Sequence, residues 1–222
     1  MGPARRFLVA VPAIGLLLFL SVYALRFGVA DSLTRSATRE INAWAATGTN
    51  PGLDAWLAVR ADLERALRWA PTNAQPSELL GVMHLRRAGR PEYAELALDY
   101  FGRALELRPS SPFAWANVAE ARYLLGMTAA PYERVLVQGW RLGPSEPETQ
   151  RLLADLGLAM WDEVGRDTQV AIRSAIASAM RRNPLDTLQI SERRGRLALA
   201  CSHVAGDKRL RETIWVQRCA GL

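Results

Sequence analysis

The sequence is poor in the side chains that most often build catalytic centres. It has two histidines, His84 and His203, and two cysteines, Cys201 and Cys219. It contains no glycine-rich phosphate loop, no serine nucleophile elbow and no His-Glu-x-x-His pattern. His203 is close to Cys201, but two candidate ligands without a nearby third do not make a zinc site. We therefore expect a protein that is not an enzyme and that holds no metal or other cofactor, with His84 as a core or groove residue.

Lysine is almost absent as well. Lys208 is the only one, so arginine carries nearly all of the basic charge. The net charge of +6 permits an anionic partner, but no run of basic residues is longer than two. This distribution argues against a nucleic-acid-binding protein.

One long apolar run stands near the N-terminus. From Phe7 to Leu25 the chain reads FLVAVPAIGLLLFLSVYAL, without a charge. As a helix this run spans about 28 Å, close to the roughly 30 Å of a bilayer's hydrocarbon core. We predict a single-pass anchor over residues 1–28, with the following domain in the periplasm. A cleaved signal peptide is the alternative, because Val22-Tyr23-Ala24 and Gly28-Val29-Ala30 resemble cleavage sites.

Similar segments, each ending in a proline, make up much of the remaining chain. The four prolines are spaced by 38, 35 and 40 residues: Pro71, Pro109, Pro144 and Pro184. A small residue precedes each proline by five positions, and bulky apolar residues precede it by eight and by four. These offsets place the bulky residues on one helical face, and the proline ends the helix. Each segment therefore reads as a helical hairpin followed by a turn, with Ser110 and Ser111 as caps of one following helix.

The hairpins resemble the tetratricopeptide repeat, whose period is about 34 residues. Ala97, Phe101, Ala104 and Pro109 match its second helix, and Trp115 matches its first. We expect an all-α fold: the anchor, a tetratricopeptide-like α-solenoid of about four hairpins over residues 29–186, and capping helices over residues 187–222. The expected helices lie near 5–28, 31–47, 53–69, 76–88, 92–107, 111–125, 131–142, 146–161, 167–182, 187–204 and 207–218.

The resemblance to this repeat also implies a binding face. Such solenoids bind partners on the concave face built from the first helix of each repeat. The repeat positions on that face are occupied by Glu78, Arg86, Phe113, Asn117, Glu120, Tyr123, Arg151 and Asp155. Asn117 is the leading candidate, since asparagine at this place in peptide-binding repeats grips the ligand backbone; a purely local hydrogen bond is the alternative. The lysines of the carboxylate-clamp subclass are missing at the matching positions, which argues against recognition of a free C-terminus.

The two cysteines leave two alternatives open. Pairing of Cys201 with Cys219 would suit a periplasmic domain. However, a helical hairpin that turns at Gly206-Asp207 would leave Cys219 roughly 10 Å beyond the residue facing Cys201. The alternative is a buried Cys201 and a free Cys219.

Most of the chain resembles the VpsP-type polysaccharide biosynthesis proteins of the bacterial inner membrane. The resemblance lies in the N-terminal anchor and in three stretches: RALELRPSSPFAWAN, RLGPSEPETQRLLADLGLAMWDEV and LALACSHVAGDKRLRETIWVQRC. It implies a scaffold or accessory protein in exopolysaccharide assembly or export, whose partners are protein subunits of that machinery. Direct polysaccharide binding is the alternative. Exposed, aligned aromatic side chains in the groove would favour the glycan, and a groove of mixed charge with an ordered Asn117 would favour a peptide.

Overall fold

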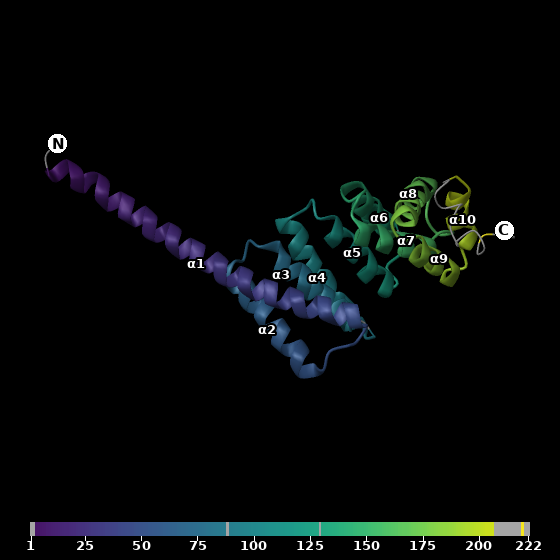
Figure 1. Ribbon diagram of the computed structural model, residues 1–222, viewed down its shortest axis with the longest axis horizontal. Helices are drawn as coiled ribbons and strands as arrows, with labels where there is room; N and C mark the ends of the chain where they lie inside the picture. The colour runs from purple at the N-terminus through teal and green to yellow at the C-terminus, as the bar shows by residue number, and fades with distance from the viewer. Residues whose placement is uncertain (1–2, 88, 129, 207–218, 220–222) are drawn as a thin grey trace. The chain divides into compact units, whose positions relative to one another are not determined.

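The computed structural model describes residues 3–87, 89–128, 130–206 and 219, and the secondary structure of this part of the chain is helical throughout, without a strand. The predicted all-α fold is confirmed (Figure 1). The chain divides into two compact units, Met1–Arg86 and Arg87–Leu222, here called unit 1 and unit 2. This boundary falls inside the predicted repeat domain, between two helices that were expected to form one hairpin.

Unit 1 contains α1 (Pro3–Thr47), α2 (Leu53–Trp69) and α3 (Ala74–Leu85). The sequence predicted a break in the first helix between residues 28 and 31, and this prediction is wrong: α1 is one helix of 45 residues. A single glycine costs a helix only about 1 kcal/mol, and Ala30 is fully buried against Ala66 of α2 and against Ala70, its C-cap residue. The packing of α2 back along α1 therefore holds this stretch helical (Figure 1).

The N-terminal part of α1 is apolar and exposed. Leu17 and Phe19 are exposed by 63% and 66%, and an 18-residue window of the helix reaches a mean hydropathy of 2.0. α1 is thus long and apolar enough to cross a membrane.

Unit 2 contains the helices from α4 to α10. Their bounds are α4 (Pro91–Leu107), α5 (Pro112–Leu124), α6 (Ala130–Leu142), α7 (Pro147–Ala159), α8 (Arg166–Arg182), α9 (Pro184–Arg193) and α10 (Leu197–Gly206). α5 packs on α6 and α7 on α8, while α7 also contacts α5 and α9, and α8 also contacts α6 and α10. These are the contacts of stacked helical hairpins. The assignment to the tetratricopeptide repeat stays a prediction.

The junction at Pro109 shows why proline recurs between these helices. α4 ends at Leu107, before the proline, and the Ser111 hydroxyl accepts a hydrogen bond from the Ala114 N–H at 3.2 Å. The predicted cap at Ser111 is therefore confirmed. At the last junction Pro184 is itself the first residue of α9. A backbone N–H at this position has no acceptor within the helix, so a proline is tolerated there.

A carboxylate from α6 caps α8. Glu133 Oε2 accepts hydrogen bonds from the Gly165 N–H, at 3.0 Å, and from the Thr168 hydroxyl, at 2.5 Å. Gly165 is the N-cap residue of α8 and has no side chain of its own for this purpose. Glu133 therefore supplies the acceptor that the first turn of α8 needs.

The C-terminal region differs from the prediction of one helix over 187–204. Gly195, with φ at +66°, separates α9 from α10. The N–H of Arg196 donates to the Ser191 carbonyl at 2.8 Å, the hydrogen bond of a glycine-ended helix. The further helix expected over 207–218 lies outside the described residues.

A disulfide joins Cys201 of α10 to Cys219. The two Cα atoms lie 5.5 Å apart, so the larger separation expected from a helical hairpin is wrong. Of the two alternatives that the sequence left open, the structure contains the bonded one.

His84 of α3 is a core residue of unit 1, as predicted. It is 1% exposed, and its ring meets the Trp56 ring edge-on with centroids 5.3 Å apart. Burial, reinforced by the Arg60 charge and opposed by Glu64, lowers the pKa of His84 from 6.5 to about 4.

This shift predicts acid sensitivity of unit 1. Between pH 6.5 and 4 the unfolded chain binds a proton at His84 that the folded chain does not, so stability falls as the pH falls. The free energy of unfolding of the wild type should drop by about 2 kcal/mol from this group between pH 7 and 5. Denaturant titration of the full-length protein in detergent at both values measures the drop. In His84→Phe the drop should shrink by about that amount, and an unchanged pH dependence would contradict the prediction.

Candidate functional site

The residues predicted to bind a partner divide between the two units. Glu78 belongs to α3 of unit 1 and Arg86 is the C-cap residue of that helix, while the other six belong to α5 and α7 of unit 2. Glu78 is only 5% exposed, so it offers little surface to a partner. Arg86 is half-buried at the C-terminal end of α3. The candidate site is therefore built from the helices of unit 2.

Asn117 of α5 makes a local hydrogen bond. Its side-chain amide donates to the Phe113 carbonyl at 2.8 Å, one turn earlier in the same helix, and the residue is 6% exposed. This is the alternative that the sequence left open for Asn117. The hydrogen bond orders the side chain, and a role for Asn117 and Phe113 in binding stays a prediction.

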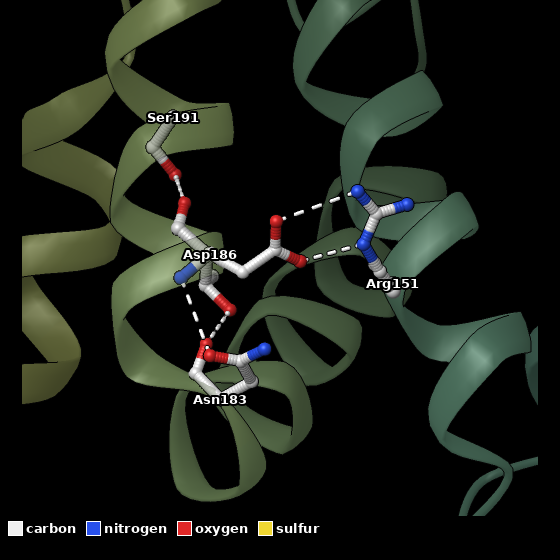
Figure 2. A network of polar contacts seen from close by, with 5 residues as sticks. Arg151, Asn183, Asp186 and Ser191 are labelled. Carbon is white, nitrogen blue, oxygen red and sulfur yellow. Dashed lines mark hydrogen bonds and ion pairs between the residues drawn. The ribbon is translucent and has the colours of Figure 1, made fainter. Parts of the chain in front are cut away.

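An ion pair fastens α7 to the first turn of α9. Arg151 donates from Nε to Asp186 Oδ2 at 2.6 Å and from Nη2 to Asp186 Oδ1 at 3.4 Å (Figure 2). The hydrogen bond to Asp186 raises the pKa of Arg151. Asn183 in turn accepts a hydrogen bond from the Asp186 N–H through Oδ1, at 3.4 Å. The N-cap of α9 thus fixes the carboxylate that Arg151 meets.

A second ion pair connects α7 to the end of α9. The Arg194 Nε donates to Asp155 Oδ1 at 2.7 Å, and its Nη1 lies 3.5 Å from the Tyr123 hydroxyl. The guanidinium carbon is 5.8 Å from the centre of the Tyr123 ring. Arg194 therefore brings together Asp155 and Tyr123, which the sequence predicted for one face, although Arg194 itself was not predicted.

Tyr132 of α6 lies in the core beneath this ion pair. It is fully buried, and its hydroxyl has no hydrogen-bond partner among the described residues. Burial raises the pKa of Tyr132; Tyr123, Asp155 and Glu120 act in the same direction, and the Arg194 charge opposes them. The phenol therefore stays protonated under all ordinary conditions, so it is suited to packing and not to proton transfer.

A cleft of about 470 Å³ opens where α7 meets α9. Two basic, two acidic and one amide side chain line it: Arg151, Asp186, Gln189, Glu192 and Arg193. Among these only Arg151 was predicted from the sequence. The other four were not predicted, because α9 was expected to begin three residues later and to belong to the capping helices outside the repeats.

A second cleft, of about 590 Å³, lies between α4 and α5 and has a more apolar lining. Leu98, Leu105, Trp115 and Met127 contribute to it. The Trp115 Nε1 is occupied by a hydrogen bond to the Pro109 carbonyl at 2.9 Å, so this indole serves the junction between the two helices.

Among the described residues, no group of three or more histidine, cysteine, aspartate or glutamate residues lies close enough together to hold a metal ion. The chain matches no protein-family model and no curated protein.

Proposed function

We propose that the chain is a membrane-anchored, non-catalytic interaction module that binds a protein partner through the face formed by α5, α7 and α9. The observation that carries this proposal is the mixed charge of the cleft between α7 and α9. A cleft that presents both arginine and carboxylate side chains suits a polypeptide segment that bears both charges. No aromatic side chain is among the residues that line this cleft, which argues for a peptide over a polysaccharide.

The proposed setting is the bacterial inner membrane, with the N-terminal part of α1 crossing it once and the rest of unit 1 and all of unit 2 in the periplasm. The apolar, exposed N-terminal part of α1 supports the anchor. The Cys201–Cys219 disulfide supports an oxidising compartment. The resemblance to the VpsP-type proteins supports a subunit of exopolysaccharide assembly or export as the partner.

The test is affinity purification of the membrane-extracted, full-length protein with mass spectrometry of the proteins that accompany it. We expect polysaccharide polymerase, co-polymerase or export subunits with the wild type. Arg193→Glu reverses one exposed charge of the cleft without touching either interhelical ion pair, so recovery should fall at least about tenfold. Asn117→Ala should weaken recovery too if this residue also touches the partner.

Arg103→Glu is the matched control, because it makes the same charge change at an exposed position of α4 in the same unit. It should leave recovery unchanged. Equal recovery with Arg193→Glu and Arg103→Glu would remove the cleft from the site. Recovery of glycan without any protein subunit would favour direct polysaccharide binding instead.

A further inference from the structure

The C-terminal turn of α2 is locked to α1 just beyond the apolar segment. Ala66 of α2 and Ala70, the C-cap residue of that helix, are fully buried against Ala30 of α1, and Phe27 and Leu33 pack around the same cluster. Three alanines in contact allow the two helix backbones to approach closely. The end of α2 is therefore held at a fixed position along the axis of α1, next to Ala30.

That level lies within the headgroup layer of a bilayer that α1 crosses. The apolar run ends at Leu25, and Ala30 follows five residues later in an unbroken helix, which is about 7.5 Å along the helix axis. The headgroup layer on each side of the hydrocarbon core is about 5–8 Å thick. With Leu25 at the edge of the hydrocarbon, the last turn of α2 thus stands among the headgroups.

The exposed side chains at this end of α2 are those that favour such a layer. Trp69 is 40% exposed, although it is a large aromatic residue, and Arg65 and Arg68 are exposed beside it. Arg26 is exposed on α1, directly after the apolar run. Tryptophan is enriched at the membrane–water interface, and arginine binds phosphate with a fork of donors. The acidic groups nearby are already paired: Asp62 with Arg65 at 3.3 Å, Glu64 with Arg60 at 2.7 Å, and Asp31 with Arg35 at 2.6 Å.

We propose that Trp69 and Arg68 at the end of α2, together with Arg26, dock into the phospholipid headgroup layer beside the point where α1 leaves the membrane. This proposal rests on the proposed membrane anchor. A second contact beside α1 fixes the rotation and tilt of unit 1 on the membrane, because interfacial anchors set both. Unit 1 then contacts the membrane through two helices, α1 and the end of α2.

The tryptophans of the chain allow a direct test. Residues 1–43 contain none, so the spanning segment itself contributes no indole fluorescence. The full-length protein is reconstituted into vesicles of phosphatidylethanolamine and phosphatidylglycerol, with or without lipids brominated close to the headgroup. Bromine quenches the indoles it touches, so the wild type should lose up to about one seventh of its emission, because Trp69 is one of seven tryptophans.

Trp69→Phe should lose little of its emission, and Trp44→Phe should be quenched like the wild type. Trp44 is the matched control, because it follows Ala30 by fourteen residues and so stands about 21 Å further from the membrane along α1. Equal fractional quenching of Trp69→Phe and the wild type would overturn the docking. Flotation of the vesicles distinguishes the two failures: protein that floats without this difference defeats the docking alone, and protein that does not float defeats the anchor as well.

Discussion

Phe101→Asp should destabilise unit 2 by at least about 4 kcal/mol, because it both removes a large core side chain and buries a charge. Phe101 is fully buried in α4. A domain is stable by only about 5–15 kcal/mol in total. The substitution is therefore large enough to abolish the packing between α4 and α5.

Hydrogen–deuterium exchange of the full-length protein in detergent, read by mass spectrometry, localises the effect. Peptides from α4 and α5 should lose their protection in Phe101→Asp. Leu96→Asp is the matched control, since it places the same charge on the same helix at a residue that is 43% exposed. That variant should change the free energy of unfolding by about 0.5 kcal/mol. Protection of α4 at the wild-type level in Phe101→Asp would contradict the placement of this helix in the core.

The helices of unit 2 could be predicted from sequence because their pattern is local. Apolar residues at fixed offsets from Pro109 and Pro144 give both the helical face and the point where each helix ends. The break at Gly195 was missed because apolar residues continue on both sides of it, through Leu188 and Ile190 and again from Leu197. A glycine there is compatible with a helix interior as well as with a helix end, and only the hydrogen bond of Arg196 to Ser191 decides between them.

The sequence predicted some residues of the candidate site in unit 2. It did not predict their partners, which lie far away along the chain. Repeat positions pointed to Tyr123 of α5 and to Arg151 and Asp155 of α7. Their partners Asp186 and Arg194 come from 35 and 39 residues further along the chain than Arg151 and Asp155. Ion pairs across such distances depend on how one hairpin stacks on the next. Composition and local period contain no such information, so the cleft between α7 and α9 needed the structure.

The close contacts between helices could not be predicted from the sequence either. One of them, at Gly157 of α7, predicts a large loss of stability on substitution. A Cβ atom at this position would lie 2.4 Å from Cγ1 of Ile172 and 2.8 Å from its Cγ2. Ile172 is a core residue of α8, 2% exposed, and both atoms are attached directly to its Cβ. Because both γ carbons face Gly157, any staggered rotation about χ1 still leaves at least one γ carbon against the added Cβ. Gly157→Ala must therefore push α7 and α8 apart.

We expect Gly157→Ala to cost about 2–3 kcal/mol of unfolding free energy, because overpacking outweighs the gain in helix propensity. Gly102→Ala in α4 is the control: a Cβ there has no neighbour within 4 Å, so it should gain up to about 1 kcal/mol. Ile172→Ala removes the colliding atoms, and in that background Gly157→Ala should no longer destabilise the protein. Denaturant unfolding of the wild type, Gly157→Ala, Ile172→Ala and the double variant completes a double-mutant cycle. A cycle without coupling would mean that α7 and α8 are not held together at this pair of residues.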